Sequence, residues 1–218
     1  PNTWAMSVQT VNAGYDPTAN DITFPAAILQ APFFDPQADP ASNYGAIGYV
    51  IGHEITHAFD LQGAQFDAHG NYADWWTAGD KAAFDQRNQR VVEAYDQVEV
   101  LPDLFVNGQL TVTENVADLG GMQAAYDALQ IALQRQGDPG PIDGFTQNQR
   151  FFIAAAQIWK EKMRDASLRT QIRTDEHAPG ITRAVMPALN MDAFYTAFPQ
   201  VQPGDPEYIA PQDRVVIW

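Results

Sequence analysis

The spacing of hydrophobic and polar residues predicts a mainly helical chain with a few short strands. In residues 7–13 β-branched and polar side chains alternate, which predicts a strand, and residues 22–24 predict a second one. Turn-forming residues at 16–21 separate the two. Helical spacing of apolar residues predicts helices over 81–95, from about 113 onward, and over 145–162.

Prolines and glycines mark the boundaries of these elements. Pro32, Pro36 and Pro40 interrupt regular structure until Ser42 or Asn43, either of which suits the N-cap of a helix that runs to about residue 61. Residues 67–71 read as a turn and residues 137–141 as a loop, and a tail rich in Pro and Gly closes the chain. The pattern predicts an α+β fold in which helix outweighs strand.

The predicted helix before residue 61 contains the sequence His53-Glu54-Ile55-Thr56-His57. On a helix, residues four apart share a face, so the two imidazoles point the same way with a carboxylate beside them. Such a group can bind zinc and keep a general base next to the metal. A coincidental string on an amphipathic helix is the alternative, and it is disfavoured because the chain has only 4 histidines.

A catalytic zinc site needs a third protein ligand and keeps one position open. The strongest source is the segment 114–121, Glu-Asn-Val-Ala-Asp-Leu-Gly-Gly. On a helix Glu114 and Asp118 share a face, so one carboxylate can reach the metal while the other orients a ligating histidine. The alternative is a solvated acidic helix face, which is common in a chain this acidic.

Composition narrows the class of protein. The 218 residues suffice for one sizeable core, and 45% are hydrophobic without a run long enough to span a membrane. A net charge of −15 argues against nucleic acid as a partner, because no basic stripe is evident to meet phosphates. The charge is compatible with cationic peptide substrates, although acidic surfaces mostly keep proteins soluble.

Several motifs together resemble the neprilysin and endothelin-converting-enzyme family of zinc metallopeptidases. They are Val11-Asn12-Ala13, FPAAILQAPFF at 24–34, NYGAIG at 43–48, HEITHAFD, ENVADLGG, DEHAPG with Arg183, and the terminal Trp218. They follow the order of the family's C-terminal catalytic half. The resemblance therefore implies that residues 1–218 form a thermolysin-like zincin catalytic lobe, of α+β class, mainly helical and with a small β-sheet.

The resemblance also implies the chemistry of the site. One Zn²⁺ would be bound by His53, His57 and Glu114, and Glu54 would be the general base. His177, otherwise a loop histidine, would stabilise the oxyanion of the tetrahedral intermediate. Two further residues complete the implied catalytic group: Arg183, otherwise a surface charge, would contact a substrate carbonyl and pair with Asp118.

Further positions match the family's substrate-binding residues. Asn12 and Ala13 resemble a clamp for the peptide backbone on an edge strand, although Asn12 alone reads as a strand-end turn residue. The pocket for the side chain after the scissile bond would be lined by apolar residues that otherwise read as plain core: Phe33, Val50 and Trp159. Asp60 either orients a histidine or is a helix-end acid without a role. His69 reads as a turn residue without a metal role.

These motifs predict a zinc endopeptidase that cleaves small peptides before bulky hydrophobic residues. A zinc aminopeptidase shares HExxH, but no Gly-x-Met-Glu-Asn-like anchor for a substrate amine precedes the helix. A peptide-binding lobe without catalysis would be expected to lack Glu54 or a ligand. A structural zinc domain would favour four closed ligands, usually with cysteine, and the chain has 0 Cys.

Two expectations concern what lies around this chain. The family's catalytic half is normally covered by a helical N-terminal lobe, which these residues do not include and which we expect as a partner beside peptide substrates. Val stands at residue 215, where the family's animal members commonly have Cys. The lack of cysteine favours a bacterial member, and we expect a periplasmic or secreted location over a cytoplasmic one.

Overall fold

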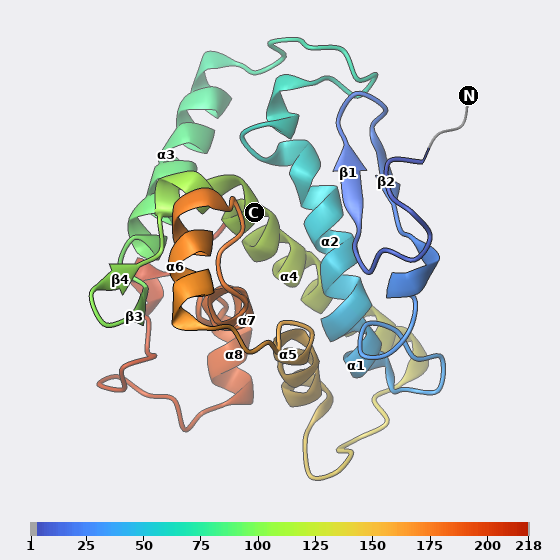
Figure 1. Ribbon diagram of the computed structural model, residues 1–218. Helices are drawn as coiled ribbons and strands as arrows, with labels where there is room; N and C mark the ends of the chain where they lie inside the picture. The colour runs from blue at the N-terminus through green and yellow to red at the C-terminus, as the bar shows by residue number, and fades with distance from the viewer. Residues whose placement is uncertain (1–3, 218) are drawn as a thin grey trace.

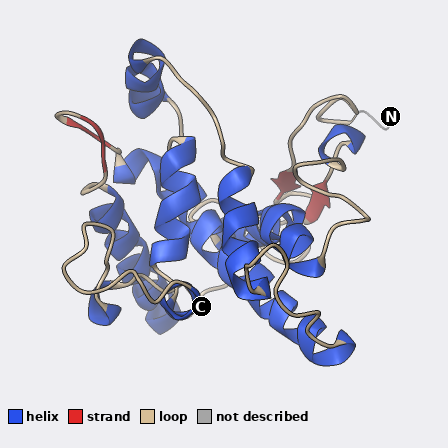
Figure 2. Ribbon diagram, turned by 90° about the horizontal axis from the view of Figure 1, so that it is seen from below, coloured by secondary structure: helices blue, strands red, loops and turns tan. Residues whose placement is uncertain are grey.

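The computed structural model describes residues 4–217 and is built mainly from helices (Figure 1). The helices in chain order are α1 (Pro40–Asn43), α2 (Tyr49–Thr56), α3 (Ala78–Tyr95), α4 (Gly108–Gln136), α5 (Gln147–Gln157), α6 (Asp165–Thr174), α7 (Gly180–Leu189) and α8 (Asp192–Ala197). The strands are β1 (Gly14–Asp16), β2 (Asp21–Thr23), β3 (Glu99–Leu101) and β4 (Leu104–Phe105). Figure 2 shows the strands as two small hairpins on opposite sides of the helical body. Within residues 4–217 no helix is both long and apolar enough to traverse a bilayer.

The first hairpin differs from the sequence prediction in its first strand. β1 pairs with β2 in antiparallel register, Gly14 opposite Thr23 and Asp16 opposite Asp21, so the predicted turn and second strand are confirmed within one residue. The predicted strand at 7–13 is wrong. Val8 and Val11 are more than half exposed, so these residues bury no common face that would hold them in a sheet.

The chain enters the HExxH helix through an irregular start. Asp39, and neither Ser42 nor Asn43, caps α1, because its side chain accepts the Ser42 backbone N–H and Pro40 fits the first helical position. A π-helical turn, Tyr44–Gly48, then joins α1 to α2. Beyond α2 a 3₁₀ turn, His57–Phe59, ends the helix two residues before the predicted end, since Asp60 is extended.

The remaining helices confirm the predicted ones and add three that the sequence did not predict. Thr77 and Asn107 cap α3 and α4, so α4 begins five residues before the predicted Thr113. α5 is shorter than the predicted 145–162 because its hydrogen bonding ends near Ile158. The region predicted as an irregular tail contains α6, α7 and α8, and Pro187 lies inside α7. The prolines of this region therefore do not prevent helix formation. Pro179 lies at the start of α7, and Pro187 is tolerated in its interior.

The two helices that carry the metal motifs cross with their backbones in contact. α2 and α4 run side by side in Figure 1. At the crossing, a Cβ on Gly52 would lie 2.4 Å from the Gly121 carbonyl oxygen, and one on Gly121 would lie 2.4 Å from the His53 nitrogen. Only glycine permits this approach. It brings the α2 histidines to the carboxylates of α4.

Candidate active site

The two histidines of α2 and a glutamate of α4 meet at one point. The Nε2 atoms of His53 and His57 are 3.0 Å apart, and Glu114 Oε2 is 3.3 Å from His53 Nε2. Glu114 Oε1 is 3.6 Å from His57 Nε2. The predicted ligand set is therefore brought together, and these three residues are positioned to bind a metal ion.

The spacing and chemistry of these atoms fit zinc. Ligands at about 2.0–2.1 Å from a tetrahedral zinc lie about 3.3 Å from one another. The three separations, 3.0, 3.3 and 3.6 Å, bracket that value. Both Nδ1 atoms face carboxylates, so each Nδ1–H donates and each Nε2 offers a lone pair. A carboxylate and two lone pairs directed at one point require a cation between them.

Each ligating histidine is held from behind by a carboxylate. The Nδ1–H of His53 donates to Asp118 Oδ1 at 2.8 Å, and that of His57 to Asp60 Oδ2 at 2.5 Å. These bonds fix the tautomer and the ring orientation. The expected orienting roles of Asp60 and Asp118 thus have a geometric basis, and Asp118, 1% exposed, acts through His53 and not on a substrate.

Arg183 of α7 completes the support beneath His53. Its Nε and Nη2 both donate to the Asp118 carboxylate at 2.8 Å, which is the predicted pairing. The Trp159 ring lies against its guanidinium, 3.9 Å from the central carbon. Despite burial, the charge of Arg183 and the hydrogen bond from His53 hold the pKa of Asp118 well below its usual range. Asp118 therefore stays ionised and can orient His53.

Electrostatics also separate the acids of the site. Burial raises the pKa of Glu54 above its ordinary value, as suits a group that accepts a proton near neutral pH. Burial opposes ionisation of Glu114, but hydrogen bonding with His53 and the neighbouring imidazoles lower its pKa. Although burial acts to lower the pKa of His53, hydrogen bonds with Asp118 and Glu114 raise it to about 9. The surroundings therefore favour a positive charge at the point where the ligands meet.

His177 lies at the edge of the same site, between α6 and α7. Its Nε2 is 3.2 Å from Glu114 Oε2, and its Nδ1 is 2.9 Å from Asp175 Oδ1. The side chain is 43% exposed, so it can meet a molecule bound in the cleft. Asp175 is not among the predicted site residues, although the Asp-Glu-His spacing allows such a local hydrogen bond.

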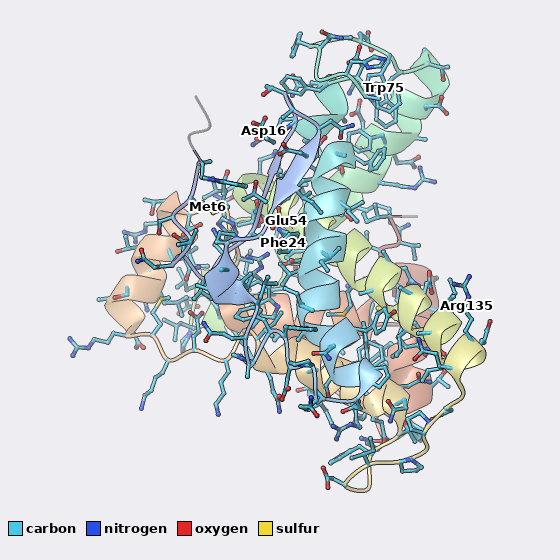
Figure 3. The ribbon with its side chains drawn as sticks, turned by 90° about the vertical axis from the view of Figure 1, so that its right-hand side faces the viewer. Met6, Asp16, Phe24, Glu54, Trp75 and Arg135 are labelled. Atoms are coloured by element: carbon cyan, nitrogen blue, oxygen red, sulfur yellow. The ribbon has the colours of Figure 1, made fainter. Side chains whose placement is uncertain are left out.

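A cleft of about 370 Å³ runs over the metal ligands and Glu54. Figure 3 shows Glu54 on the side of α2 that faces the β1–β2 hairpin. All of the predicted substrate-binding residues line the cleft: Asn12, Ala13, Phe33, Val50, Trp159 and Arg183. Asn12 and Ala13 lie just before β1, so the predicted strand position of this clamp is wrong by two residues. His69 lies in an exposed turn, as predicted, and is not among the residues that line the cleft.

Tyr49 is a further lining residue that the sequence did not reveal. It is fully buried, its ring meets Trp159 edge to face, and its pKa is raised by burial and by Asp118. The sequence could not predict the burial of Tyr49, because that burial depends on how α2 packs against α4.

A zinc site with two histidines from an HExxH helix and a glutamate from a later helix is typical of the thermolysin-like class of zinc peptidases. The sequence model of peptidase family M13 matches residues 12–215 of the chain. The chain therefore belongs to peptidase family M13.

Relatives and solved structures agree with this assignment. The neutral endopeptidase of Lactobacillus helveticus is 42% identical over 99% of the chain, and endothelin-converting enzyme 1 of Cavia porcellus is 40% identical over 99%. A zinc metalloprotease of Mycobacterium tuberculosis, solved with an inhibitor, superimposes with a TM-score of 0.94 over 100% of the chain at 48% identity. The chain spans 31% and 28% of those two relatives and 34% of that structure.

Proposed function

We propose that the protein is a zinc-dependent endopeptidase that hydrolyses small peptides. The observation that carries the proposal is the meeting of His53, His57 and Glu114 beside the buried carboxylate of Glu54 in an open cleft. Membership of family M13 supports it. The retained Glu54 and complete ligand set speak against a lobe that only binds peptides. Cut-site mapping on peptides with blocked amino termini separates this function from an aminopeptidase.

The chemistry divides among a few side chains. Zinc held by the three ligands would supply Lewis acidity, which polarises a carbonyl and acidifies water. Glu54 accepts the proton of the water that attacks the peptide carbonyl and passes it to the leaving amine. His177 donates toward the oxygen that becomes negative as the carbonyl is attacked. Arg183, paired with Asp118, donates to a substrate carbonyl. Asn12 offers a donor and an acceptor to the substrate backbone.

The proposed metal site predicts a specific loss of zinc. Glu114→Ala removes one of three ligands and is expected to weaken zinc binding by more than about 100-fold, beyond the effect typical of an outer partner. Elemental analysis after dialysis against a series of chelators of increasing affinity measures the loss of zinc. Glu207→Ala, a change of the same kind at an exposed site, should keep zinc. Full zinc occupancy in Glu114→Ala would disprove this ligand set.

We further propose that cleavage occurs before bulky hydrophobic residues, and three apolar lining residues support this. Phe33 and Val50 pack with the buried Ile28, and Trp159, which lies against Arg183, lines the same cleft. Together they offer an apolar surface next to Glu54. Burying a Leu or Phe side chain there stabilises the bound state by about 1.5–3 kcal/mol.

Peptides that differ only at the residue after the scissile bond test this preference. We expect kcat/KM for Phe or Leu to exceed that for Ala by about tenfold to 100-fold, from the burial energy above. Phe33→Ala should reduce the ratio without changing the zinc content. Equal rates for Phe and Lys at this position would contradict the proposed pocket.

We also propose that a helical lobe outside this chain covers the cleft. The relatives are more than three times as long as the chain, which leaves room for such a lobe. Exposed apolar side chains directly follow cleft-lining residues in the chain: Leu29 is 51%, Ile51 38% and Ile55 52% exposed. Such a surface is typical of one that another part of a protein covers.

A further inference from the structure

Basic residues are concentrated in one segment of this acidic chain. Residues 160–173 contain five of the 12 Lys and Arg residues and only two acids, Glu161 and Asp165, a local charge of +3. With a net charge of −15 for the whole chain, the remaining residues carry −18. The five cations, which we call the basic segment, are Lys160, Lys162, Arg164, Arg169 and Arg173.

The cations of the basic segment are exposed and unpaired. None of the five side chains forms an ion pair or hydrogen bond with any part of residues 4–217. Elsewhere Lys81, Arg150 and Arg214 each lie in an ion pair. The acids within the segment do not neutralise it: Glu161 accepts the Gly180 N–H at the start of α7, and Asp165 lies in the first turn of α6.

The segment begins at the cleft. Lys160 directly follows Trp159, which lines the cleft and stacks on Arg183. A side pocket of about 170 Å³ that Lys160 lines shares Trp159, His177 and Arg183 with the cleft. A peptide that fills the cleft and continues past Trp159 therefore enters a pocket lined by Lys160 and Glu161, and Lys162 and Arg164 follow next in the chain.

The packing of α6 directs the rest of the segment outward. Ile172 is buried and Leu168 partly buried in the core beneath α6, while Arg169 and Arg173 stay exposed. In Figure 3 nitrogen-tipped side chains extend away from the ribbon between α5 and α6. An alternative reason for these cations is the favourable interaction of a positive charge with the C-terminal end of a helix. That interaction is confined to the last turn, so it explains only Arg173.

We propose that the basic segment binds acidic side chains of the substrate peptide on the carboxyl side of the scissile bond. The proposal rests on the function above, because Trp159 borders the pocket assigned to the residue that follows that bond. Lys160 and Lys162, nearest the cleft, would make the first contacts. The net charge of the chain is compatible with cationic substrates, but the local charge of the basic segment predicts a preference for acidic residues at these positions.

The size of the positive region favours a short acidic peptide over other anions. An extended polyanion, such as a nucleic acid or an anionic membrane surface, would also face the −18 charge of the rest of the chain. A peptide of a few residues spans only the cleft and the segment next to it, where the acids beyond the metal site are Glu161 and Glu176. Screening confines such interactions to about 8 Å at physiological salt, so nearby charges dominate.

The test uses the zinc-loaded, full-length protein and peptides that share one cleavable bond. A single Glu is moved through each of the three positions on either side of the bond, with Gln as the uncharged match. Glu two or three residues after the bond should raise kcat/KM about threefold to tenfold over Gln at low salt, the range for a few exposed pairs. The advantage should fall as ionic strength rises.

Charge reversal links that advantage to the segment. Lys160→Glu/Lys162→Glu should abolish or invert the Glu preference and leave the Gln peptides within about twofold of their wild-type rate, since neither lysine contacts the reacting groups. The control, Arg87→Glu/Arg135→Glu, makes the same change in net charge at exposed residues away from the cleft and should keep the preference. Arg135 lies on the opposite side of the molecule from α6 in Figure 3.

Three outcomes would overturn the proposal. They are no difference between Glu and Gln peptides, a Glu preference only before the bond, and a preference that survives reversal of Lys160 and Lys162. An equal loss for all peptides in that variant would assign the segment to contact with another part of the protein. Failure to cleave any peptide would instead contradict the proposed function, so the two failures are distinguishable.

Discussion

Glu54→Gln is expected to lower kcat by at least about 10²–10⁴-fold, the usual contribution of a general base, with zinc content and folding unchanged. The substitution keeps the shape of the side chain and removes its ability to accept a proton. Glu54 is 5% exposed and is not one of the three metal-binding residues, so its replacement leaves the ligands in place. The burial that raises its pKa also favours the neutral amide.

Three measurements on the same preparation separate a lost base from a lost structure. They are peptide turnover, zinc content by elemental analysis, and the midpoint of thermal unfolding. Glu207→Gln is the matched control at an exposed position and should behave as wild type. Cleavage by Glu54→Gln at a rate near that of wild type would end the assignment of Glu54 as the base.

Gly121→Ala is expected to reduce the free energy of unfolding by about 1–3 kcal/mol or more, because overpacking a close contact forces the backbone to move. The added Cβ would lie 2.4 Å from the His53 nitrogen and 2.7 Å from its Cα, distances that only a shift between α2 and α4 can relieve. Since the shift separates His53 from Glu114, zinc affinity should fall as well.

Gly79→Ala provides the matched control on α3. A Cβ at Gly79 meets nothing closer than 4.0 Å, and alanine favours a helix over glycine by up to about 1 kcal/mol, so this variant should be as stable as wild type or more. Denaturant unfolding and zinc titration of both variants check the prediction. If Gly121→Ala kept both stability and zinc affinity, the backbone contact would not limit the site.

The sequence predicted the site better than it predicted the fold around it. His53, His57, Glu114 and Asp118 were predictable because their spacing follows one helical period, so each pair shares a face before any packing is known. The carboxylate that orients each histidine could also be proposed from the sequence. Asp60 follows His57 by three residues, and Asp118 lies one helical turn after Glu114.

The errors in the predicted fold have a common physical cause, because each concerns a segment whose structure depends on contacts with residues far away in the sequence. Residues 7–13 alternate like a strand but pair with no other strand: Ser7 to Thr10 forms a turn, Val8 and Val11 are exposed, and only Ala13 is buried. α7 carries an interior proline, yet its burial against α4 and α5 stabilises it. Tyr49 and the crossing of Gly52 with Gly121 likewise arise only when α2 and α4 pack together.

The π-helical turn at Tyr44–Gly48 makes the length of this part of the chain as important as its composition. Each residue of an α-helix advances the side chains by about 100° around the axis, so one residue gained or lost there would rotate HExxH away from α4 by that angle. The loop before α5 could absorb the same change without moving any ligand. A substitution at an exposed position between Asp39 and His53, such as Ile51, leaves the rotation of the helix unchanged, but an insertion or deletion of one residue there would disconnect the histidines from their glutamate.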